Sequence, residues 1–220
     1  MFYLLNIFKY LLNKILTVGL SRLKINHALN GLLYTVERMI MVSKYFNRLI
    51  KYFESTFDFT RPFTWNGHTY DALACFHAHV DKYVLVKKAQ LWACDSHEYC
   101  IINTYEESFT VEEFDQLTTV LTDYLEPHYV RNDESDPEKD HMYSYLTLII
   151  VCGCPLAKDV IRKVKGYRFT KYYKMYTRGY SEAHVILVDT LNSKVYTNAA
   201  GKTKLKLCKN VFKDLKAGKE

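Results

Sequence analysis

The run MYSYLTLIIV, residues 142–151, is the most apolar stretch in the body of the chain, and it limits the folds that the chain can adopt. A continuous apolar run of this length is typical of a strand at the centre of a sheet, buried on both faces. Such a strand needs other strands at its edges and helices over its faces. The sequence on either side is therefore expected to supply both.

Strand-like runs precede and follow this segment. Asn66-Gly67 between β-prone runs predicts a type I′ hairpin, whose second strand continues through ALACFHAHV. The runs YVLVKKAQLWACD and EYCIINTYE predict two further strands joined by a tight turn at residues 95–97. After the central run, three more strands are expected in YRFTKYYKMYTRGY, AHVILVDT and KVYTN.

Three segments predict helices. Ser43 is a suitable cap for a helix over residues 43–54. Thr110 and Glu113 have the spacing of a capping box, and the helix that they begin is expected to end before Pro127. A third helix over residues 155–166 has proline in its first turn and glycine at its end.

The predicted elements follow the order α-β-β-β-β-α-β-α-β-β-β, which is an α+β fold: one mixed, mostly antiparallel sheet with helices packed on it. No internal repeat and no Gly/Ser/Pro-rich linker divides the chain. We therefore expect a single globular domain over residues 41–207. Residues 208–220 are lysine-rich and are interpreted as a basic tail.

Residues 1–40 have a different character, because residues 1–36 contain no Asp or Glu. In one interpretation they are a translated leader before a natural start at Met41, since the codons of Glu37-Arg38 can spell a ribosome-binding sequence. In the other they form an amphipathic extension that lies on a membrane. Lys9 and Lys14 interrupt the apolar face, so no transmembrane span is expected.

The cysteine content indicates the cellular location of the protein, and the charge distribution indicates which partners it can bind. The six cysteines form no C-x-x-C pair, which favours reduced thiols and a cytoplasmic protein. Residues 106–140 carry twelve acidic side chains and two basic ones, whereas residues 156–220 carry sixteen basic and five acidic ones. A basic C-terminal third can attract nucleic acid or an acidic protein, fold against the acidic segment, or support self-association.

The stretch ACFHAHVD places Cys75, His77, His79 and Asp81 at alternate positions, so these side chains share one face of a strand. We favour a partly wet sheet face, with the side chains of the opposite face packed in the core: Ala72, Ala74, Phe76, Ala78 and Val80. The alternative is a metal-dependent hydrolase in which His77, His79 and Asp81 are ligands. Because this spacing is a weak metal signal, no metal site is expected.

Other enzyme signatures do not occur. The sequence has no G-x-S-x-G elbow, no P-loop and no G-x-G-x-x-G, and we expect no bound cofactor. The order of elements resembles the core of PD-(D/E)xK nucleases, but VLVKKAQLWA has no acid two residues before a lysine. A nuclease-like fold would therefore be degenerate.

The most distinctive stretch is GYRFTKYYKMYTRGY. In a continuous strand, one face would combine cationic and aromatic side chains: Arg168, Tyr172, Lys174, Tyr176 and Arg178. Such a face suits single-stranded nucleic acid or a phosphorylated ligand, because rings stack on bases and cations contact phosphates. The alternative is an ordinary solvent-facing strand.

The body of the chain resembles an uncharacterised domain family of unknown function from low-GC Gram-positive bacteria. The resemblance rests on NGHTYDALACFHAHVDKYVLVKKAQLWACDSHEYC, on RGYSEAHVILVDTLNSKVYTNAAGK and on the helix between them. It implies a cytoplasmic single-domain protein and supplies no catalytic residues. We therefore favour a non-enzymatic binding or regulatory domain.

Overall fold

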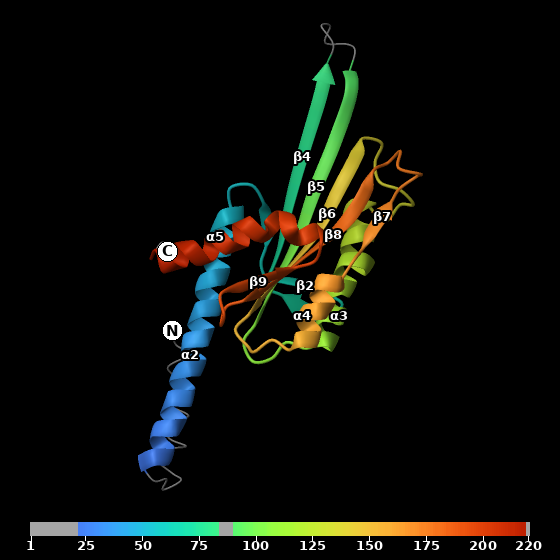
Figure 1. Cartoon of the computed structure of the whole chain (residues 1–220). Helices are drawn as coiled ribbons and strands as arrows, with labels where there is room; N and C mark the ends of the chain where they lie inside the picture. Colours follow the sequence, from blue (N-terminus) through green and yellow to red (C-terminus); the bar gives the residue numbers. More distant parts are fainter. Residues whose placement is uncertain (1–21, 84–89, 219–220) are drawn as a thin grey trace.

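The computed structural model describes residues 22–83 and 90–218, and its centre is a seven-stranded mixed sheet (Figure 1). The strands are β1 (Asp58–Thr60), β4 (Ala72–Tyr83), β5 (Gln90–Tyr105), β6 (His141–Cys152), β7 (Thr170–Tyr172), β8 (Tyr180–Asp189) and β9 (Lys194–Thr197). They lie in the order β1-β4-β5-β6-β8-β7, and β9 also pairs with β8. Only the pairs β5–β6 and β6–β8 are parallel, which confirms the predicted mixed, mostly antiparallel sheet.

The apolar run MYSYLTLIIV, residues 142–151, lies in the central strand β6. Its residues from Leu146 to Cys152 are all buried. Strands β5 and β8 pair with the two edges of β6, and helices cover both faces of the sheet around the buried residues from Leu146 to Cys152. The prediction of a doubly covered central strand is confirmed.

Two layers of helices cover the sheet. On one side lie α3 (Val111–Thr119), η1 (Val120–Val130) and α4 (Lys158–Gly166), which pack on Leu73, Ile101, Leu148 and Val185. On the other side lie α2 (Arg22–Phe53) and α5 (Leu205–Lys216), preceded by the short turn η2 (Ala200–Lys204); they pack on Ala74, Cys100, Ile149 and Ile186. We call these sides the α3/α4 face and the α2/α5 face.

The helix predicted over residues 43–54 is part of the longer helix α2, so Ser43 is an interior residue and not a cap. Among the side chains of α2 that the structure describes, the buried ones begin at Val42 and continue through Tyr45, Leu49 and Phe53. The preceding part of α2 projects beyond the sheet (Figure 1). Among the described helices, none is long and apolar enough to cross a membrane.

The capping box of α3 is confirmed. The Thr110 hydroxyl accepts a hydrogen bond from the Glu113 amide (3.2 Å), and the Glu113 carboxylate accepts one from the Thr110 amide (2.6 Å). The predicted end before Pro127 is wrong, because the helix continues to Val130 as the π-helix η1. The proline lacks an amide donor, and the altered hydrogen-bond spacing of a π-helix accommodates it.

The Asn66-Gly67 turn joins β2 (Phe63–Trp65) to β3 (His68–Tyr70), and both turn residues have positive φ, as the sequence predicts. However, β2 and β3 form a small separate sheet, and the strand predicted to continue from β3 is interrupted at Asp71. The Asp71 carboxylate accepts a hydrogen bond from the Thr104 amide (2.7 Å), which fixes the break before β4.

Two further predictions differ from the structure. Residues 95–97, expected as a turn, lie inside β5, because β4 and β6 pair with β5 along both of its edges there. The segment set apart as a basic tail begins inside α5, which buries Cys208, Val211 and Phe212 against the sheet. Lysines on the opposite side of α5 account for its basic composition.

Candidate functional site

The predicted basic-aromatic strand is short. Strand β7 spans Thr170–Tyr172, and a turn follows in which Lys174, Met175 and Tyr176 all have positive φ. The turn reverses the chain into β8, so the alternation predicted for residues 167–180 stops after Tyr172. The expected single face of five side chains is therefore not a strand face.

The turn nevertheless brings two of the predicted residues together. The rings of Tyr172 and Tyr176 are 4.4 Å apart, and their side chains are 52% and 69% exposed. Tyr180 of β8 lies 6.0 Å from Tyr172, because these two residues pair directly across β7 and β8. The turn thus adds an aromatic side chain to the edge of the sheet.

Two tyrosines of β6 extend this group across the sheet. Tyr143 of β6 lies 6.2 Å from Tyr180 and stacks on Tyr145 at 4.7 Å. We call the five residues Tyr143, Tyr145, Tyr172, Tyr176 and Tyr180 the tyrosine face. It belongs to the α2/α5 face of the sheet, since Tyr143 and Tyr145 alternate in phase with Ile149. All five side chains reach solvent.

Buried polar residues border the tyrosine face toward α5. Glu98 accepts hydrogen bonds from the hydroxyl of Thr147 (2.7 Å) and the ammonium of Lys204 (2.5 Å). His184 stacks on Tyr145 at 4.4 Å and is only 2% exposed. Its Nδ1 atom has no hydrogen-bond partner among the described residues.

Burial sets the protonation states here. It lowers the pKa of His184, so the imidazole is neutral at neutral pH. It also raises the pKa of Tyr145, and a hydrogen bond with Tyr180 adds to this shift. Tyr145 therefore presents a neutral phenol beside the buried ion pair of Glu98 and Lys204.

The predicted cations occupy different places. Arg168 and Lys174 are exposed, one before β7 and one in the turn that follows it. Arg178 contacts the loop that follows η1: its guanidinium donates to the Pro137 carbonyl at 3.4 Å. Of the three predicted cations, Arg168 and Lys174 are therefore the exposed ones, and they lie four residues before and two residues after Tyr172 in the sequence.

The two histidines of ACFHAHVD lie on the α3/α4 side of β4, and both are exposed. The predicted inward positions Ala72 and Ala74 are buried, Phe76 and Ala78 are only half-buried, and the side chain of Val80 lies outside what the structure describes. The opposite face of β4 is covered by α3 and η1 at Leu73 and is exposed at His77 and His79.

His77 faces a cavity of about 220 Å³ that we call the histidine cavity. The His77 and His97 rings approach each other with Nδ1 atoms 2.8 Å apart. His141 donates from Nδ1 to the Arg178 carbonyl (2.7 Å), its Nε2 lies 2.9 Å from the Ser144 hydroxyl, and burial lowers its pKa. The other lining residues are Asp95, Tyr99, Tyr129, Val130, Asn132 and Glu138.

The candidate metal ligands do not converge. His79 pairs with Asp95 on β5, and His68 contacts Gln116 at 2.6 Å in a different part of the molecule. The backbone of Asp81 pairs with Ala93, and its side chain lies outside what the structure describes. Within residues 22–83 and 90–218, no three His, Cys, Asp or Glu side chains are grouped to hold a metal ion.

Tyr143, Tyr145, Tyr180 and His184 were not predicted from the sequence as site residues. A signal existed in MYSYLTLIIV, where tyrosines alternate with other residues before the fully buried part begins. Alternation at one end of a central strand indicates that one face emerges from the core there. The contribution of Tyr180 depends on the pairing of β6 with β8, which local patterns do not specify.

Comparison with known proteins gives one match. A family model described as a domain of unknown function (DUF8052) matches residues 41–210. No curated protein and no solved structure matches significantly. The tyrosine face and the histidine cavity lie within the matched residues.

Proposed function

Since the chain belongs to the DUF8052 family of domains of unknown function, its geometry is the basis on which we propose a function: a non-enzymatic cytoplasmic domain that binds single-stranded nucleic acid on the tyrosine face. One observation supports this above all others. Five tyrosines from β6, β8, β7 and the following turn reach solvent on one side of the sheet, with neighbouring rings 4.4–6.2 Å apart.

Exposed rings on a sheet are suited to unpaired bases. Stacking of a base on an aromatic side chain contributes about 1–3 kcal/mol, and every base offers a ring face. Tyr172 and Tyr176 are the most exposed members and form the edge of the platform. Bases in a duplex already stack on one another, so the face favours single strands.

The distribution of charged side chains also favours the α2/α5 face as the side that binds nucleic acid. Arg168 and Lys174 are exposed close to Tyr172 in the sequence and can contact phosphates. The acidic side chains of α3 and η1 belong to the opposite, α3/α4 face. A polyanion is therefore repelled less on the α2/α5 face.

The test compares variants that remove exposed tyrosines. We expect Tyr172→Ala with Tyr176→Ala to weaken binding of a labelled oligo-dT of about 12 nucleotides by about tenfold or more, measured by fluorescence anisotropy. Tyr34→Ala is the matched control, because Tyr34 is 54% exposed on α2, away from the tyrosine face. Equal losses in both variants, or no binding by the unmodified chain, would refute the proposal.

The salt dependence tests the role of the cations separately. Each phosphate contact to a single strand contributes about −0.7 to the slope of log K against log salt. Replacing Arg168 and Lys174 by alanine should therefore make the slope shallower by about 1.4. Binding with an unchanged slope would show that these side chains do not contact phosphates.

The alternative function is a metal-dependent hydrolase that uses His77, His79 and Asp81. His77 has a second imidazole, that of His97, beside it, but the Nδ1 atoms are 2.8 Å apart, which is a hydrogen-bond separation and not that of two ligands of one zinc ion. Elemental analysis of the purified protein separates the two functions. Stoichiometric zinc or manganese would favour the hydrolase and oppose the non-enzymatic proposal.

A further inference from the structure

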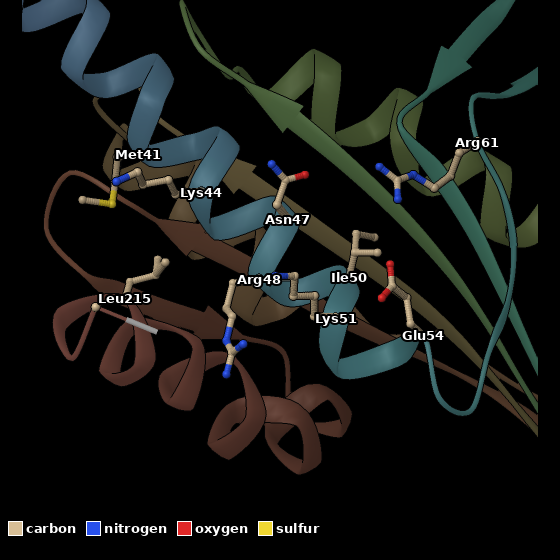
Figure 2. Close-up of a pocket in the computed structure, with 10 residues that line it drawn as sticks. Met41, Lys44, Asn47, Arg48, Ile50, Lys51, Glu54, Arg61 and Leu215 are labelled. Atoms are coloured by element: carbon tan, nitrogen blue, oxygen red, sulfur yellow. The ribbon is translucent and has the colours of Figure 1, made fainter. Parts of the chain in front are cut away.

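A second cavity, of about 580 Å³, lies along α2 between that helix, α5 and the loop before β2 (Figure 2). Its volume is in the range of pockets that hold small molecules. We call it the basic groove; its lining residues are Met41, Lys44, Asn47, Arg48, Ile50, Lys51, Glu54, Arg61, Leu215 and Gly218. None of them belongs to the tyrosine face or to the histidine cavity.

We infer that the basic groove binds a small phosphate ester with more than one phosphoryl group. The lining includes four cationic side chains and one carboxylate, that of Glu54. Lys44, Arg48 and Lys51 follow one another on α2 at spacings of four and three residues, which places them on one side of the helix. Like charges at these spacings repel one another, and a bound anion relieves that repulsion.

Among the residues that the structure describes, Arg48 is the one of these cations that pairs with a carboxylate. The Arg48 guanidinium donates twice to Asp214 of α5, at 3.1 and 2.7 Å, and the Tyr52 hydroxyl donates to the same oxygen at 2.6 Å. This arrangement holds Arg48 between the two helices. Figure 2 shows its side chain directed toward α5.

The other three cations are available to a ligand. Lys44 and Lys51 are exposed, and neither pairs with a carboxylate among the described residues. Arg61 lies over the Phe46 ring at 5.3 Å and comes from the loop before β2, reaching toward α2 (Figure 2). Three uncompensated cations from two segments therefore border one cavity.

The spread of the cations selects the class of anion. Seven residues of helix rise about 10 Å, so a single phosphoryl group contacts both Lys44 and Lys51 only if the two side chains bend toward each other. A chain of phosphoryl groups can contact both. Ile50 and Leu215 provide an apolar part of the lining, which suits the organic portion of an ester.

The experiment uses the full chain and sodium tripolyphosphate, titrated by calorimetry at low salt. We expect the unmodified chain to bind, and Lys44→Gln with Lys51→Gln to weaken binding by about tenfold or more. The matched control is Lys158→Gln with Arg162→Gln, which removes two exposed cations from α4 on the other face of the sheet. Thermal unfolding of each variant shows that it is folded.

Several results would overturn the inference. One is absence of tripolyphosphate binding by the unmodified chain, and another is an equal loss in the control variant, which would indicate attraction to any basic surface. Inorganic phosphate binding as tightly as tripolyphosphate would refute the requirement for several phosphoryl groups. An oligo-dT affinity that falls as much as the tripolyphosphate affinity in the α2 variant would make the groove part of a nucleic-acid surface. Retained tripolyphosphate binding in the Tyr172/Tyr176 variant would show that the groove acts independently of the tyrosine face.

Discussion

At the scale of single residues, His97 is the clearest case of an environment that changes a side chain's chemistry. Burial, and then the neighbouring His77 and His141, lower its pKa from 6.5 to about 4, while Asp95 opposes this shift. The Glu138 carboxylate also lines the cavity. The folded protein therefore holds His97 neutral at a pH where the unfolded chain would protonate it.

This predicts that acid destabilises the protein through His97. Between pH 6.5 and about 4 the unfolded state binds the additional proton, so the free energy of unfolding decreases as the pH falls through that window. The full shift corresponds to at most about 3 kcal/mol, and solvent in the cavity reduces it, so we expect a loss of about 2 kcal/mol. Urea denaturation across this pH range measures it.

The matching variant is His97→Gln, which removes the titrating group and should make the pH dependence in this window shallower. His141 remains, and its pKa is also lowered by burial, so part of the dependence should persist. His68→Gln is the control, because His68 contacts Gln116 outside the cavity. If both variants keep the full acid sensitivity, another group is responsible for it.

At the scale of elements, the sequence predicts features that depend on local interactions correctly and fails where pairing between distant strands decides the structure. The Asn66-Gly67 turn and the Thr110/Glu113 box form as predicted because the interactions that define them lie within four residues. The turn expected at residues 95–97 fails because pairing with β4 and β6 stabilises an extended chain there. Tertiary contacts overrule a weak local turn preference.

The candidate site likewise combines residues that the local sequence predicts with residues that only strand pairing brings together. The composition of GYRFTKYYKMYTRGY correctly indicated an exposed aromatic surface at Tyr172 and Tyr176, but the strand model assigned its geometry wrongly. Three consecutive residues with positive φ replace the expected strand after residue 173, and no glycine among them signals this. The rest of the tyrosine face comes from β6 and β8, whose pairing joins residues that are distant in sequence.

At the scale of the whole molecule, α2 crosses the boundary that the sequence analysis placed at Met41. The family match begins at residue 41, and among the described side chains of α2 the buried ones begin at Val42. Before that point, Arg38 contacts the rest of the domain: its guanidinium donates to the carbonyls of Gly153 and Glu106.

These contacts lead to a prediction about the first forty residues. A chain that starts at Met41 should fold, since it keeps every apolar side chain of α2 that is buried among those the structure describes. We expect its free energy of unfolding to fall by about 1–3 kcal/mol, the contribution of the charged hydrogen bonds that Arg38 makes. Arg38→Ala in the full chain should reproduce most of that loss in urea denaturation. An unfolded shortened chain, or a loss far larger than that of Arg38→Ala, would mean that residues 1–40 belong to the domain.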